Sequence, residues 1–176
     1  MKHLFLAVLV CIASTGTLSA QNNNRNSMDS SMKASDKKFA TEAAEAGLAE
    51  VEMGKLGQNQ GSSAKVKEYG RMMEKDHRKA NDELQELAGK NNITLPSTLP
   101  SAMQNKHDAL MKKSGQDFDR AFMKQMIEDH KKVITLFENE EKNGQNEQLR
   151  TWARKTLPTL RQHLEHAQKI YDDLDK

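Results

Sequence analysis

Apolar residues recur at helical spacing along most of the chain, and short polar breaks interrupt them at intervals. A stripe of apolar residues every three or four positions is typical of a helix that packs on one face. The stripes predict four long helices, Asp36–Gln60, Ala64–Lys90, Asp117–Glu141 and Glu147–Leu174. Asp36 is the expected N-cap of the first helix. Four amphipathic helices of this length predict an all-α domain.

The breaks between the stripes predict how the helices connect. Gly61-Ser62-Ser63 and Asn143-Gly144 are long enough only for tight turns, so each should join an antiparallel pair. The link between the two pairs is longer: Pro96 and Pro100 favour an extended stretch, and Ser101–Lys113 should form a short helix. We therefore predict a ferritin-like four-helix bundle of two antiparallel hairpins joined by a long crossover that contains a short helix. Pro158 should kink the last helix or begin a second segment.

The residues before the first stripe predict export. Residues 1–20 combine a basic start, an apolar run and a small residue, Ala20, suited to cleavage, which is the pattern of a signal peptide. The apolar run is too short to span a membrane, so we expect no membrane span in the mature protein. Residues 21–35 are polar and low in complexity and should form a disordered linker, leaving 36–176 as the bundle domain. We expect the protein in the periplasm or associated with the outer membrane.

Composition excludes several classes of function. Cys11, within the predicted signal, is the only cysteine, so the mature chain has no disulfide, zinc–thiolate site or cysteine nucleophile. Without Lys2 the basic residues number 26 against 25 acidic ones, so no charge excess favours nucleic acid or an anionic membrane as a partner. The sequence leaves two candidate partners, an envelope protein and a second copy of the chain.

Each predicted helix carries one potential metal ligand on its apolar face: Glu50, His77, His130 and His163. A titratable group on a packing face requires a partner. Counted from the turns, the four lie within roughly 10 Å of one another along the bundle axis, so they can share one layer. One carboxylate and three imidazoles suit zinc, iron, copper or nickel. Glu74, three residues before His77, is a candidate outer member of the site.

Other interpretations of these positions stay open. The methionines near the histidines would suit copper(I); they are Met53, Met73, Met123 and Met126. The four polar residues can also form a metal-free network in a structural or interaction module of the envelope. A ferritin-type oxidase would need several carboxylates and paired Glu-x-x-His motifs, which the chain lacks, so we assign no catalytic residue. The acidic end of the third long helix, which includes Glu140, should be solvated.

Several motifs together resemble a known family. They are AEVEMGKL from Ala49, MMEKDHRKANDEL from Met72, DFDRAFMKQMIEDHKKVITLFENE from Asp117, and LRTWARKTLPTLRQHLEHAQKI from Leu149. The chain resembles an exported bacterial family of unknown function with a ferritin-like fold, often labelled "predicted outer membrane protein". The resemblance covers residues 36–174 and implies fold and export rather than an activity. It implies recurring polar positions at Glu50, Asp76, His77, Asp129, His130 and His163, which adds Asp76 and Asp129 to the outer members.

Overall fold

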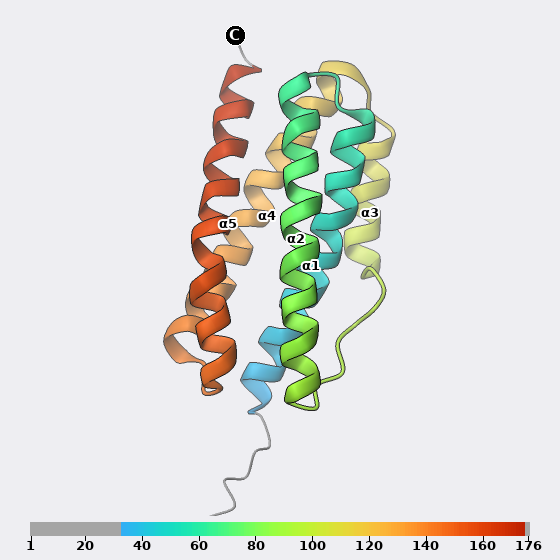
Figure 1. The fold of residues 1–176 in the computed structure, drawn as a ribbon. Helices are drawn as coiled ribbons and strands as arrows, with labels where there is room; N and C mark the ends of the chain where they lie inside the picture. The colour runs from blue at the N-terminus through green and yellow to red at the C-terminus, as the bar shows by residue number, and fades with distance from the viewer. Residues whose placement is uncertain (1–32, 175–176) are drawn as a thin grey trace, which may run out of the picture. The chain divides into compact units, whose positions relative to one another are not determined.

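The computed structural model describes residues 33–174, and five helices account for most of them (Figure 1). They are α1 (Ala34–Gln60), α2 (Ala64–Lys90), α3 (Ser101–Met111), α4 (Gly115–Asn143) and α5 (Glu147–Asp173). α1 pairs with α2 and α4 pairs with α5, with α3 on the connection between the two hairpins. The predicted fold class is therefore confirmed. The predicted signal peptide and nearly all of the predicted linker lie outside the described residues.

The four long helices form a ring in which each helix packs beside two others. α1 contacts α2 and α4, and α5 also contacts α2 and α4. The crossover returns along the bundle, so α4 starts at the same end as α2 and runs parallel to it (Figure 1). Every neighbouring pair in the ring is consequently antiparallel. α3 lies outside the ring, against α1 and α4.

Small residues let α1 and α2 approach closely. A Cβ atom added at Gly54 would lie 2.6 Å from the Glu74 amide nitrogen, and one added at Gly70 would lie 2.6 Å from the amide nitrogen of Gln58. Such contacts are with backbone atoms, which cannot rotate away as a side chain can. These glycines therefore set the separation of the first hairpin.

The helix ends differ from the sequence expectation at Asp36. α1 begins at Ala34, and Asp36 is not its N-cap. The buried carboxylate of Asp36 instead accepts hydrogen bonds from the amides of Gln145 and Asn146, just before α5. Asp36 thus ties the start of α1 to the α4–α5 turn. The expected second segment at Pro158 is also absent, because α5 runs through it as one helix.

The acidic end of α4 is only partly solvated. Glu138 is exposed, but Glu140 is 3% exposed and its Oε1 has no hydrogen-bond partner among the described residues. Burial and the neighbouring charge of Asp36 raise the pKa of Glu140 to about 7. The expectation that Glu140 is solvated is therefore wrong.

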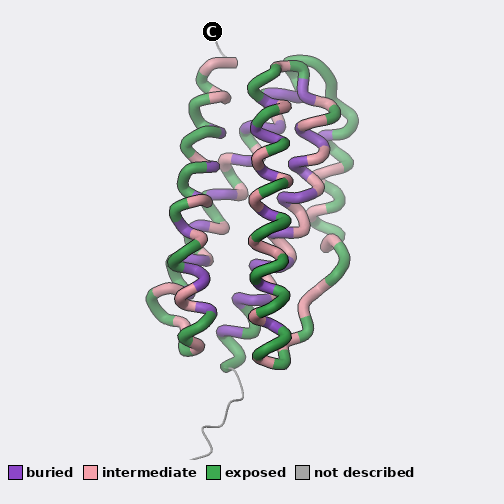
Figure 2. Tube along the Cα trace, in the orientation of Figure 1, coloured by how far each residue is buried: buried purple, intermediate pink, exposed green. Residues whose placement is uncertain are grey.

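Buried residues face the inside of the bundle (Figure 2) and form two apolar clusters. The first includes Phe39, Leu84, Ile134, Phe137, Trp152 and Leu160, and the second includes Met53, Tyr69, Met73, Phe122, Met126 and Ala167. On each long helix, one of the four predicted site residues falls between the positions that contribute to the two clusters. A polar layer therefore divides the apolar core. Within residues 33–174, no helix is both long and apolar enough to cross a membrane.

Candidate metal centre

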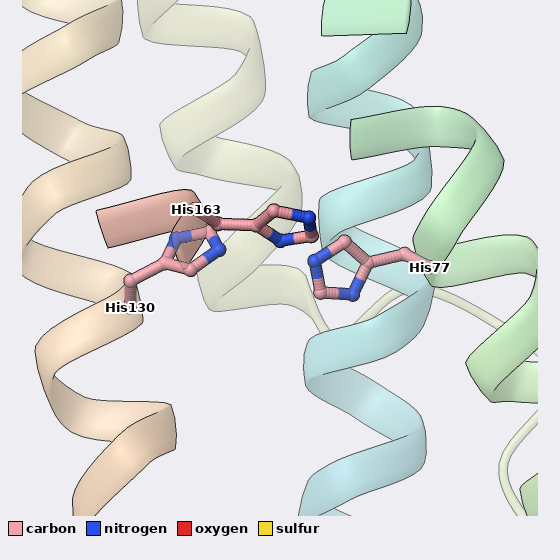
Figure 3. A group of neighbouring side chains, drawn as sticks. All are labelled: His77, His130 and His163. Atoms are coloured by element: carbon pink, nitrogen blue, oxygen red, sulfur yellow. The ribbon is translucent and has the colours of Figure 1, made fainter. Parts of the chain in front are cut away.

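Three histidines from three helices converge in the polar layer: His77 of α2, His130 of α4 and His163 of α5 (Figure 3). The exposed fraction of each residue is 6% or less. Their ring centroids are 5.3–5.8 Å apart. One nitrogen from each ring lies within 4.8 Å of those of the other two. No other group of three or more potential ligands this close is found in the described part of the chain.

Hydrogen bonds fix the protonation of two of the rings. His130 Nδ1 lies 2.9 Å from the carbonyl oxygen of Met126, which can only accept, so Nδ1 carries the proton. His163 Nε2 lies 3.1 Å from Oδ2 of Asp76, and the same reasoning places its proton on Nε2. The opposite nitrogen of each ring then holds a free lone pair. Metal-binding histidines are commonly oriented by such carbonyl and carboxylate partners.

Three ring nitrogens, one from each histidine, are buried and have no hydrogen-bond partner among the described residues; they are His77 Nε2, His130 Nε2 and His163 Nδ1. Buried polar atoms are nearly always satisfied. If His77 carried its proton on Nε2, it could donate to only one of the other two nitrogens at a time. Hydrogen bonding within the group therefore leaves one lone pair unsatisfied, whereas one metal ion would satisfy all three nitrogens.

The electrostatics of the group favour neutral rings. Burial lowers the pKa of His77 well below its usual 6.5, and the nearness of His130 and His163 lowers it further. Burial and the neighbouring His163 lower the pKa of His130 to about 4, against the opposing effect of the Met126 carbonyl. Burial also lowers the pKa of His163, although Asp76 partly offsets it. All three are thus neutral near pH 7, the form in which imidazole binds a metal.

The structure places Glu50 beside the histidine group rather than within it. Glu50 is 4% exposed, and its Oε1 lies 3.7 Å from Nδ1 of His130, the nitrogen that faces away from the group's free lone pairs. Its Oε2 has no hydrogen-bond partner among residues 33–174. Burial, with the charge of Asp129, raises the pKa of Glu50 to about 8. A cation at the three nitrogens would favour the ionised carboxylate instead.

The three outer candidates have different surroundings. Asp76 contacts the group directly through His163. Glu74 accepts hydrogen bonds outside the group, from Arg78 at Oε1 and from Gln58 at Oε2. Asp129 faces α3 and pairs with Lys106 at 2.7 Å. The sequence pattern also did not distinguish Tyr69, whose hydroxyl donates to the His163 carbonyl oxygen at 3.3 Å and holds α2 against α5.

The group is slightly wider than a bound metal requires. A point equidistant from three atoms 4.8 Å apart is about 2.8 Å from each, against a Zn–N distance of ~2.1 Å. Each ring must therefore move by less than about 1 Å, which small side-chain rotations supply. A cavity of about 20 Å³ adjoins His77 and His130 and gives the rings room to move.

Fold and site together define a class: a four-helix bundle, with a helical crossover, whose core holds three convergent histidines. The chain belongs to the family described as Domain of unknown function (DUF4142), which matches residues 21–170. That match agrees with the resemblance to a family of unknown function. Comparisons with curated proteins and with solved structures found no match.

Proposed function

We propose that the protein binds one transition-metal ion through His77, His130 and His163. The observation that carries the proposal is the set of three buried ring nitrogens, close together and unpartnered, two of which have their protons held on the far side of the ring. A histidine that served only as a core residue would use its hydrogen-bonding capacity on neighbours. Here three ring nitrogens without hydrogen-bond partners in the described part of the chain lie close enough together for a single ion to bind all of them.

Three imidazoles leave at least one coordination position for another ligand. Glu50 is the candidate, since its Oε2 is buried without a hydrogen-bond partner among the described residues and the group otherwise contains only neutral ligands. Its carboxylate, with Oε1 3.7 Å from His130 Nδ1, would offset the charge of the ion, or bind the ion after a change of rotamer. Zinc, iron, copper and nickel all accept this donor set.

Metal analysis and titration test the proposal. The purified full-length chain should bind one equivalent of Zn²⁺ or Co²⁺, and cobalt should show the visible bands of a histidine-bound ion. His77→Gln, His130→Gln and His163→Gln should each weaken binding at least tenfold, because each removes one of three ligands. Glutamine keeps most of the volume, so folding can be checked by circular dichroism.

His166→Gln is the matched control, because His166 lies on α5 three residues after His163 but is exposed. It should bind metal as the wild type does. One-to-one binding that survives all three core substitutions would show that the ion sits elsewhere, and the proposal would be wrong.

We further propose that the protein is exported and acts in metal handling or envelope stress in the periplasm or at the outer membrane. The signal-like pattern of residues 1–20 supports export, and the family match begins directly after it, at residue 21. Cell fractionation tests the location. Retention in the cytoplasm of a chain that keeps residues 1–20 would contradict it.

A second candidate is a metal-free structural module of the envelope. It is favoured by two bonds that join α2 to α5 without an ion, Asp76 to His163 and Tyr69 to the His163 carbonyl. Under this proposal the purified protein contains no metal, and its thermal stability is unaffected by a chelator. Metal analysis therefore separates the two candidates.

A further inference from the structure

Glu50 borders two cavities. The inner one, of about 20 Å³, adjoins His77 and His130. The outer one, of about 150 Å³, lies between α1, α3 and α4 and adjoins Asp129 and Lys106. Three residues line both cavities, and Glu50 is the only polar one; the others are Ala46 and Val133. The Glu50 side chain therefore stands in the wall between the outer cavity and the histidines.

The outer cavity carries two acidic side chains, Glu50 and Asp129, and two basic ones, Lys106 and Lys132, on an otherwise apolar lining. Glu50 is at its inner wall, and Asp129 is 21% exposed and pairs with Lys106 on α3. Carboxylate oxygens bind divalent cations, so two of them along one cavity form successive positions for an ion. Lys106 neutralises the outer position, with its Nζ 2.7 Å from Oδ1 of Asp129, and Lys132 lies farther from the same oxygen, at 3.8 Å.

α3 covers this cavity and is held by few interactions. Leu110 is the only buried residue among its eleven, and no side chain caps its N-terminus. Apart from the Lys106–Asp129 pair, its C-terminal end is held by Gln60, which donates to the carbonyls of Met111 and Lys113. An element with little buried surface opens at lower free energy than the bundle helices.

We infer that a divalent cation reaches the three histidines through the α1/α3/α4 cavity, by way of Asp129 and Glu50, and that the Lys106–Asp129 ion pair closes this route. The inference rests on the proposed metal site. A second groove, between α2 and α5, reaches the site at Asp76. Four basic and three acidic side chains line that groove, a net positive charge that disfavours a cation; they are Lys65, Arg71, Lys75 and Lys169, and Glu68, Asp76 and Asp173.

The test is the rate at which the metal-free full-length chain takes up and releases Co²⁺. Stopped-flow absorbance follows loading, and excess chelator follows release. Lys106→Ala should speed both rates at least threefold and leave the dissociation constant unchanged, because Lys106 blocks the route but binds no metal. Lys65→Ala is the matched control: it removes another interhelical ion pair of 2.7 Å, Lys65–Asp173, beside the second groove. It should leave both rates unchanged.

A double variant tests the part played by the carboxylate. Adding Asp129→Asn to Lys106→Ala should return the loading rate toward the wild-type value, since the cavity stays open but its outer carboxylate is lost. Rates unchanged by Lys106→Ala, raised equally by Lys65→Ala, or unaffected by the added Asp129→Asn would each overturn the route while leaving the metal site intact. Absence of cobalt binding by the wild type would overturn the proposed function, and the route with it.

Discussion

His163 directs its Nε2 proton to Asp76, and this hydrogen bond determines which nitrogen faces the core. The carboxylate is 35% exposed, so it orients the ring from the bundle surface without a large cost of burial. Partners of this kind usually contribute more to metal affinity than to folding. Asp76 should therefore behave as a positioning residue for the proposed metal.

Asp76→Asn tests this role. An amide can accept from the ring or donate to it, so the tautomer of His163 is no longer fixed. We expect metal affinity to fall about 10- to 100-fold, with little change in the stability of the metal-free protein. Competition with a chromogenic zinc chelator measures the affinity, and Asp82→Asn, at an exposed position on the same helix, is the control. Equal affinity in wild type and Asp76→Asn would exclude the role.

The buried titratable groups predict how the stability of the metal-free protein depends on pH. The pKa of each core histidine is lower in the folded protein than in the unfolded chain, so acidification below about pH 6.5 should destabilise the fold. The pKa values of Glu50 and Glu140 are raised from 4.5 to about 8 and about 7, so the stability that their protonation contributes falls as the pH rises from about 4.5 and is lost above those values.

The two effects oppose each other between about pH 4.5 and 6.5, because the histidines disfavour acidification and the glutamates disfavour a rise in pH. Above that range only the glutamates act. Stability should therefore be highest at or just below pH ~6.5, with a slope of up to ~1.4 kcal/mol per pH unit for each net proton. Urea unfolding in chelator between pH 4.5 and 9 measures it. Glu50→Gln should flatten the alkaline side, and an unchanged slope there would contradict the assignment to Glu50.

At the scale of the helices, the close contact of α1 and α2 gives the sharpest prediction. Gly70→Ala would place a Cβ atom 2.6 Å from both the Gln58 amide nitrogen and the Gly54 carbonyl oxygen. We expect a loss of about 1–3 kcal/mol in the free energy of unfolding, because the helices must separate.

Gly89→Ala is the matched control on the same helix, since a Cβ atom there meets nothing within 4 Å. It should stabilise the protein by up to ~1 kcal/mol through helix propensity. Urea denaturation measures both variants. Equal effects of the two substitutions would show that the α1–α2 separation is not set by Gly70.

Helix periodicity predicted the elements well because packing faces repeat every three to four residues. α2 has the predicted bounds, and α4 extends the predicted Asp117–Glu141 by two residues at each end. The same periodicity indicated that His77, His130 and His163 point inward. It could not show that Glu50 lies beside Nδ1 of His130, because that contact depends on the rotamers of both side chains. Nor could it show that Asp36 and Glu140 are buried, since both lie where the ends of separate helices meet.

At the scale of the whole molecule, metal binding should raise thermal stability. A ligand at 100 times its dissociation constant that binds only the folded state adds about 2.7 kcal/mol. For a chain of this size that corresponds to a rise in Tm of roughly 5–10 °C. Differential scanning fluorimetry with Zn²⁺ and then excess chelator measures the rise and its reversal. A combined His77→Gln, His130→Gln, His163→Gln variant should show neither, and an equal rise in that variant would assign the effect to another site.

The polar layer between the two apolar clusters has a consequence for folding. Each cluster draws on all four long helices, so each half of the bundle has a core of its own. Between the two apolar clusters, the side chains of the layer are three neutral imidazole rings and one carboxyl group. An ion in that layer would couple the two halves into a single cooperative unit. Without it, hydrogen exchange should show the half containing Trp152 and the half containing Phe122 opening with different free energies.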